Sequence, residues 1–187
     1  IICERFKKMN NTEEVPIRDA ATVILLRKKK DSTYVLMGQR GNKAVFMPSK
    51  YVFPGGAVDE DDSKVKLFKS IDAKGIDLLH QYSKKKIAKE LCVAAIRELW
   101  EEAGLRLCAK VDDVGKISPG CEDFCNSTFL PDASNLEYVF RAITPPGRPR
   151  RFDARFFICR AENVYGNLDD FSSASTELSH LQWIDIN

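Results

Sequence analysis

Three glutamates near the middle of the chain have the spacing of a metal-binding site. Glu98, Glu101 and Glu102 lie three and four residues apart, a spacing that places side chains together on one stripe of an α-helix. Like charges on one stripe repel one another, and anions near the C-terminal end of a helix oppose its dipole. A bound cation would offset both effects, and Mg²⁺ prefers oxygen ligands of this kind. The triplet therefore predicts a divalent-metal site, with a solvated acidic helix face as the alternative.

The helix that must carry these glutamates is predicted over residues 87–103. Cys92, Ile96 and Leu99 fall within one narrow arc at about 100° per residue, which is the pattern of a buried helix face. Gly104 follows, and glycine commonly ends a helix in the left-handed conformation. Strands are expected at residues 20–26, 33–39, 105–107, 137–143, 152–159 and 181–184, with a further short strand within 46–56. Strands on both sides of a long helix predict a mixed α/β layer fold.

The size and charge of the chain narrow its class. It has 187 residues and a formal net charge of +2, which favours one globular domain over 1–187, with residues 1–17 as a lead-in. The near-neutral charge argues against a general nucleic-acid coat. No apolar stretch approaches the ~20 residues of a membrane span, so no membrane partner is expected. With no signal segment and six scattered cysteines, the sequence predicts a cytoplasmic protein with reduced thiols.

The same helix carries a resemblance to a known family. The run Arg97-Glu98-Leu99-Trp100-Glu101-Glu102-Ala103-Gly104-Leu105 is similar to the second half of the signature of the Nudix hydrolase family. The first half begins at Gly56 and places an acid six residues on, at Asp62, where the family usually has Glu. Typical members have seven residues between that acid and the arginine, whereas this chain has 34. The excess forms a basic insertion, residues 63–89, that is predicted to be helical. It leaves three other acids open in the role of Asp62, namely Asp59, Glu60 and Asp61.

This resemblance implies a fold, an activity and a set of site residues. The fold is a Nudix-type α/β/α sandwich with a mixed β-sheet. The activity is hydrolysis of the pyrophosphate bond in a nucleoside diphosphate linked to a further group. Glu98, Glu101 and Glu102 are implied as ligands of Mg²⁺ or Mn²⁺, with Arg97 orienting one of them and Gly56 bringing a carbonyl near the metal. The general base is then a glutamate of this motif or Glu177, which precedes the last predicted strand.

Two further stretches bear on the substrate, namely residues 46–48 with 52–56, and residues 144–157. Residues 141–160 hold six arginines and a single acid, and arginines beside a Pro/Gly loop suit phosphate recognition through forked contacts. The candidate substrate-binding residues are Arg40, Phe53, Arg148, Arg150, Arg151 and Phe152. These stretches and the insertion resemble the long-insertion branch of the family that contains the peroxisomal coenzyme A diphosphatase. Coenzyme A or an acyl-coenzyme A is therefore one expected substrate.

Other substrates and other classes of protein stay open. ADP-ribose or a dinucleotide would suit the same chemistry, and in each case the expected partner is a small nucleotide. A Nudix-fold module that has lost catalysis and binds a ligand or RNA is a different class. Damage to the metal helix would mark it, and here Arg97 and the three glutamates are intact. The Lys84-Lys85-Lys86 run offers an RNA contact, against the simpler interpretation of the insertion as a solvated cap. The sequence makes no prediction of oligomeric state.

Overall fold

One long central strand organises the sheet of this protein, whose computed structural model describes residues 15–42, 48–113, 115, 117, 121, 124–125 and 128–187. The strands of this sheet are β1 (Ile17–Lys29), β2 (Ser32–Arg40), β3 (Tyr51–Val52), β4 (Gly55–Ala57), β7 (Glu137–Ile143), β8 (Arg151–Arg160) and β9 (Leu178–Asp185). They lie in the order β3-β2-β1-β8-β7, and β4 also pairs with β1 while β9 pairs with β2. Strand β1 is parallel to β8 and antiparallel to β2 and β4, so the sheet is mixed as predicted.

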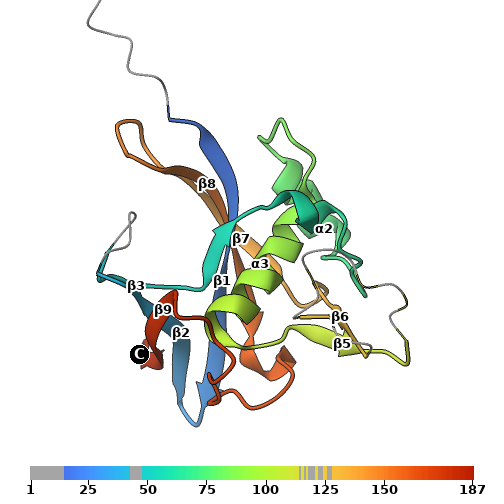
Figure 1. Cartoon of the computed structure of the whole chain (residues 1–187), viewed down its shortest axis with the longest axis vertical. Helices are drawn as coiled ribbons and strands as arrows, with labels where there is room; N and C mark the ends of the chain where they lie inside the picture. Colours follow the sequence, from blue (N-terminus) through green and yellow to red (C-terminus); the bar gives the residue numbers. More distant parts are fainter. Residues whose placement is uncertain are drawn as a thin grey trace, which may run out of the picture.

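Helices lie against this sheet. They are η1 (Glu60–Ser63), α2 (Ala73–His80), α3 (Ala88–Ala103) and η2 (Ala161–Asn163), and a separate two-stranded sheet joins β5 (Cys108–Lys110) to β6 (Phe129–Pro131). Figure 1 shows α3 crossing in front of the sheet with α2 beside its N-terminal half. No helix in the described ranges is both long enough and apolar enough to cross a membrane.

The main core lies between α3 and β1. Successive side chains of a strand point to opposite faces, and on one face of β1 the side chains of Ala21, Val23 and Leu25 are fully buried. They belong to one apolar cluster with α3 residues that include Ile96 and Leu99. This packing confirms the helix face that the periodicity predicts, and it fixes the rotation of α3 over the sheet.

The long elements confirm the sequence predictions, and their ends differ. Helix α3 ends as expected, because Gly104 is left-handed with φ 70° and its amide donates to the Trp100 carbonyl. Strand β1 begins at Ile17, inside the predicted lead-in, whose first 14 residues lie outside the described ranges. The predicted strand at 105–107 is wrong. Leu105 and Leu107 are buried in the core, and β5 begins only at Cys108.

The insertion is less helical than predicted. Within residues 63–89 the only complete α-helix is α2, and α3 begins at Ala88. Helix α2 begins after Asp72, whose carboxylate accepts the Gly75 amide at 2.7 Å. Gly75 lies inside α2, where it packs closely against Ile71. Gly75 is therefore tolerated because it sits in the first turn, next to a capping residue and against the core.

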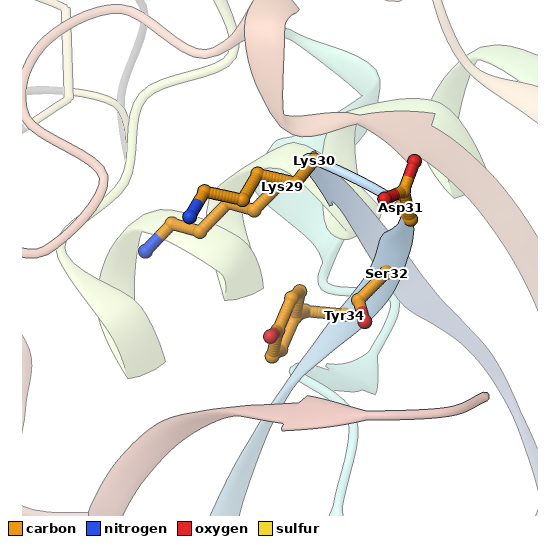
Figure 2. A pocket seen from close by; sticks show the side chains of 5 residues that line it. All are labelled: Lys29, Lys30, Asp31, Ser32 and Tyr34. Atoms are coloured by element: carbon orange, nitrogen blue, oxygen red, sulfur yellow. The ribbon is translucent and has the colours of Figure 1, made fainter.

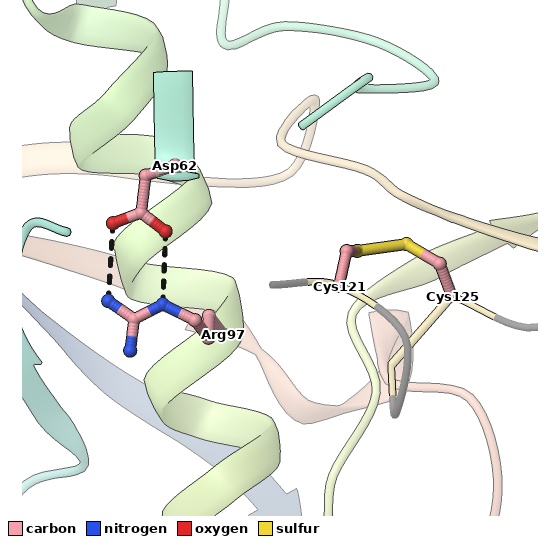
Figure 3. Close-up of a disulfide and its surroundings, with 4 residues drawn as sticks. All are labelled: Asp62, Arg97, Cys121 and Cys125. Atoms are coloured by element: carbon pink, nitrogen blue, oxygen red, sulfur yellow. Dashed lines mark hydrogen bonds and ion pairs between the residues drawn. A yellow bond between two sulfur atoms is a disulfide. The ribbon is translucent and has the colours of Figure 1, made fainter. Parts of the chain in front are cut away.

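The structure corrects the prediction of reduced thiols for one pair of cysteines. Cys121 and Cys125 form a disulfide, drawn in Figure 3. The Cys125 amide donates to the Cys121 carbonyl at 2.6 Å, and this turn brings the two Cα atoms to 5.4 Å, within the range that a disulfide spans. Cys92, Cys108 and Cys159 are free thiols.

Candidate active site

The two buried glutamates of α3 lie against the backbone of β4. Glu98 and Glu102 are 9% and 1% exposed, and they are one helical turn apart. The Gly55 amide donates to Glu102 Oε2 at 2.8 Å. A methyl group placed at Gly56 would overlap the Glu98 carboxylate. Gly56 is therefore required by the close approach of the strand, because any side chain there would displace Glu98.

Burial disturbs the protonation of both carboxylates. It raises the pKa of Glu98 to about 7, an effect that Arg97 opposes and that the charges of Glu101 and Glu177 reinforce. Burial also raises the pKa of Glu102 to about 8, although a backbone hydrogen bond acts in the opposite direction. The protein's own cations therefore do not keep both carboxylates fully charged at neutral pH, and a further cation beside them would do so.

Arg97 connects the segment after β4 to this pair of glutamates. Its Nε and Nη2 donate to the two oxygens of Asp62 at 3.0 and 3.2 Å, as Figure 3 shows. Its Nη1 donates to Glu98 Oε1 at 2.8 Å, and Nη2 also donates to the Ala57 carbonyl at 2.9 Å. Burial acts to lower the pKa of Arg97, but the bonds to Asp62 and the charge of Glu98 raise it overall. Asp59 approaches only to 3.7 Å from the exposed side, so Asp62 is the acid that holds Arg97.

Glu101 lies at the outer edge of the same cluster. Its carboxylate is half-exposed and accepts from Arg97 Nη1 at 3.3 Å. Its backbone carbonyl accepts the Ser175 amide at 2.7 Å. Gly104 in turn lies close to the backbone of Ser173 and Ala174. The chain that leads into β9 is thereby held along the end of α3, which brings Glu177 to the site.

Glu177 and Arg40 complete the charged cluster. Arg40 Nη2 lies 3.4 Å from Glu177 Oε1. The charge of Glu177 acts on both buried glutamates, and the charge of Arg40 acts on Glu102. The Glu177 side chain is 59% exposed, so solvent reaches it. Arg40 Nε is buried and has no hydrogen-bond partner among the described residues, which leaves it a donor to offer.

The predicted substrate-binding residues separate into two groups. Arg40 lies beside the glutamates, and the half-buried Phe53 is in the link between β3 and β4 that precedes Gly55. By contrast, Arg151 and Phe152 donate to Thr144 within the β7–β8 hairpin, and Arg148 and Arg150 are exposed in its loop.

Strand register measures the separation of this hairpin from the site. Arg151 pairs with Ile17, whereas Gly56 pairs with Ala21, four residues further along β1. Four residues of a strand span about 13 Å. The structure therefore brings together Arg40, Gly56, Arg97, Glu98, Glu101, Glu102 and Glu177, and it does not bring Arg148, Arg150, Arg151 or Phe152 to them. The sequence analysis missed Gly55 as a donor, although the Gly55-Gly56 pair was a signal for close backbone approach.

A second surface hollow lies outside this site. An open cavity of about 580 Å³ at the β1–β2 turn is lined by Lys29, Lys30, Asp31, Ser32 and Tyr34, whose side chains are drawn in Figure 2. None of the candidate site residues lines it. The side chains of Ser32 and Tyr34 contribute to lowering the pKa of the nearby Asp185 carboxyl.

The residues of the site fit a divalent metal by their chemistry. No three His, Cys, Asp or Glu side chains in the described ranges converge on one point, because Arg97 holds Glu98 and Glu101 while Gly55 holds Glu102. The donors are all carboxylate oxygens, which suit Mg²⁺ and Mn²⁺. Burial is the main cause of the raised pKa values of Glu98 and Glu102, and a bound cation would favour their charged forms. The donor set is therefore suitable, and a bound ion requires small side-chain rotations.

Comparisons with known proteins agree with this architecture. No protein-family model matches the chain. The chain is 29% identical over 182 residues to the curated protein "Putative nudix hydrolase 7" of Caenorhabditis elegans, an alignment covering 90% of this chain and 51% of that protein. The chain thus spans about half the length of this relative.

Solved structures give the same result. The crystal structure of a NUDIX hydrolase from Alicyclobacillus acidocaldarius is similar with a TM-score of 0.65 and 24% identity, covering 91% of this chain and 79% of that one. A MutT/nudix family protein from Enterococcus faecalis gives a TM-score of 0.50 and 15% identity, covering 98% and 49%. The chain therefore has the Nudix fold, and its curated relative supports the Nudix hydrolase family. The coenzyme A branch stays a prediction.

Proposed function

We propose that this chain is the catalytic domain of a divalent-metal-dependent pyrophosphohydrolase that acts on a nucleoside diphosphate linked to a further group. The observation that carries this proposal is the packing of the Gly55–Gly56 backbone against two buried glutamates whose neighbour, Arg97, is clamped by Asp62. Burial of acids that are not fully compensated is costly for a fold, so this arrangement favours a function for the charge over a purely structural role.

The metal would be held by Glu98, Glu101, Glu102 and the Gly56 carbonyl. A bound Mg²⁺ or Mn²⁺ neutralises pyrophosphate oxygens and lowers the pKa of a bound water. Arg97 fixes the Glu98 side chain through the 2.8 Å bond to Oε1. The Gly55 amide fixes Glu102 in the same manner. Both glutamates are thus held by protein donors, and their side chains would rotate from these positions to share an ion.

The proton of the attacking water needs an acceptor that solvent can reach. Glu177 meets this condition, because its side chain is 59% exposed and lies beside Arg40 at the rim of the site. We assign Glu177 as the general base, with Glu101 as the second candidate because it is also half-exposed.

Substrate recognition is assigned first to Arg40. Its Nη2 lies 3.4 Å from Glu177 Oε1, its buried Nε has no hydrogen-bond partner among the described residues, and arginine suits forked contact with phosphate. Coenzyme A or an acyl-coenzyme A is the proposed substrate, in line with the length of the insertion between Asp62 and Arg97. The arginines of the β7–β8 hairpin would reach only a substrate that extends along β1 toward Ile17.

A product screen tests this function. The purified chain is incubated with coenzyme A, acyl-coenzyme A, ADP-ribose, NADH, dinucleoside polyphosphates and nucleoside triphosphates, with Mn²⁺, Mg²⁺ or EDTA. We expect metal-dependent cleavage of a pyrophosphate bond, with phosphopantetheine released from coenzyme A. Cleavage of ADP-ribose or a dinucleotide, but not of coenzyme A, would contradict the proposed substrate and still support pyrophosphate hydrolysis. Ligand binding with no cleavage at any metal concentration would overturn the proposed enzymatic activity and would favour a ligand-binding module.

A further inference from the structure

The insertion meets the sheet at a cluster of buried charges. Arg155 is 1% exposed, and its Nη1 lies 2.7 Å from Asp19 Oδ1 and 3.2 Å from Asp153 Oδ2. Arg141 forms a fork with the two oxygens of Asp153, both at 2.6 Å. These four residues, together with Lys85, are called the ionic cluster below. Its arginines, which the sequence analysis included in a basic strip for phosphate, already bind carboxylates.

The insertion supplies one side of the ionic cluster. Lys85 Nζ lies 2.6 Å from Asp19 Oδ2, the oxygen that Arg155 leaves free. The Tyr82 carbonyl accepts from Arg141 Nη1 at 2.9 Å, and Ser83 Oγ lies 3.5 Å from Arg155. Three groups within four residues of the insertion thus contact charged side chains of β1, β7 and β8. A solvated cap would not make such contacts.

Asp19 connects the insertion to β4, the strand that packs against the glutamates of the site. Its backbone carbonyl accepts the Val58 amide at 2.9 Å, directly after β4. The next residues of β1, Ala20 and Ala21, pair with Ala57 and Gly56. The Ala57 carbonyl accepts Arg97, and Gly56 lies against Glu98. The side chain of Asp19 is therefore one backbone hydrogen bond away from the strand that orients the glutamates.

We infer that the Tyr82–Lys85 segment of the insertion is a positioning element, which holds Asp19 and through it the β4 strand against Glu98 and Glu102. This inference rests on the proposed function for its kinetic consequence, but its structural part is independent of it. Lys85 is the residue to change, because its side chain is exposed at 64% and its loss leaves the buried Arg155–Asp19 pair intact.

Amide hydrogen exchange followed by NMR tests the structural part, in the chain without metal or substrate. In Lys85→Ala the Val58 amide should exchange about two- to fivefold faster, the range of a partly exposed ion pair. Lys85→Arg, which keeps the charge, should restore the slow exchange. Lys84→Ala is the matched control, because Lys84 is exposed and forms no ion pair with a described residue. Its Val58 exchange should equal that of the unchanged chain.

Kinetics test the positioning role. Lys85→Ala should lower kcat and raise the Mn²⁺ concentration for half-maximal activity, with the KM for substrate unchanged. Unaltered Val58 exchange in Lys85→Ala, or an equal change in Lys84→Ala, overturns the inference whatever the activity. Faster exchange with normal kcat and normal metal dependence overturns the positioning role. If the unchanged chain cleaves no pyrophosphate, the proposed function fails, and the exchange result still decides whether the insertion holds β4.

Discussion

The Asp62 carboxylate and the Arg97 guanidinium, 35 residues apart in the sequence, face each other through two hydrogen bonds of 3.0 and 3.2 Å. The insertion begins after Asp62 and ends before Arg97. Its ends meet at the site, since Lys89 Nζ donates to the Ser63 carbonyl at 2.8 Å. The two halves of the Nudix-like motif are therefore adjacent in space despite the extra residues between them.

Loss of this pair should destabilise the fold. Asp62→Asn removes the charge that faces the buried Arg97, and leaving a buried cation without its partner costs about 3 kcal/mol. Asp59→Asn is the control, because Asp59 is exposed and 3.7 Å away, and it should cost less than about 1 kcal/mol. Urea unfolding curves measure both. Equal stability of the two variants would contradict the assignment of Asp62.

A methyl group at Gly56 should reduce turnover more than stability. Gly56→Ala pushes the Glu98 carboxylate out of its position, and we expect kcat to fall about 10²-fold, as for the loss of one oriented catalytic group. Gly41→Ala is the matched control, because nothing lies within 4 Å of a methyl group there. Steady-state kinetics with a fixed Mn²⁺ concentration compare the two. An active Gly56→Ala variant would show that the position of Glu98 does not matter.

The two buried glutamates should matter more than the exposed one. Glu98→Gln and Glu102→Gln remove charge at fixed size, and each should lower kcat by about 10²-fold or more. Glu101→Gln should have a smaller effect, because Glu101 is half-exposed and held only by a 3.3 Å bond. Glu90→Gln, in the first turn of α3, is the control. Isothermal titration with Mn²⁺ should give the same ranking for metal affinity, and full activity of Glu102→Gln would exclude the metal site.

Arginines near and far from the glutamates should differ in their effect on substrate affinity. Arg40→Ala should raise KM about tenfold with a smaller change in kcat, because a phosphate contact made in both ground and transition states is lost. Arg151→Ala should raise KM only for a substrate long enough to reach the β7–β8 hairpin. Measurements with coenzyme A and with ADP-ribose distinguish these cases, and a KM unchanged in both variants would remove both arginines from the binding site.

The ionic cluster should contribute a pH-dependent part of the stability. Burial alone would raise the pKa of Asp19, but its bonds to Lys85 and Arg155 hold it below the ordinary value. The unfolded chain then binds more protons near pH 4, so stability rises with pH there. Above an unfolded pKa of about 3.9 the contribution is complete, and it is lost as pH falls through the folded pKa. We expect Asp19→Asn to cost roughly 2 kcal/mol at pH 7 and progressively less as the pH falls through the lowered pKa of Asp19, as measured by urea unfolding.

The sequence predicted the helix, most strands and the central residues of the site, because these depend on local pattern. The spacing of apolar residues was sufficient to predict helix α3. The Arg97–Glu102 run was sufficient to select the three glutamates as candidate site residues. The choice among four consecutive acids could not be made from sequence, since only the packing of η1 against α3 buries Asp62 and leaves Asp59 exposed. The role of Arg155 and Arg141 was also hidden. Their acidic partners lie on β1 and across the β7–β8 pair, and a local count of arginines does not include the strand register.

The parallel pairing of β1 with β8 constrains how this chain folds during synthesis. Asp19 and Arg155 are 136 residues apart, so β1 must wait for β8 to emerge from the ribosome before its ladder can form. All the glutamates of α3 are made long before that, and the apolar faces of β1 and α3 have no complete sheet to support them in the meantime. Long-range parallel pairing is slow, in the range of milliseconds to seconds, and such intermediates are prone to aggregate. Truncation before residue 160 should therefore yield an insoluble chain although it keeps every residue of the Arg97–Leu105 motif.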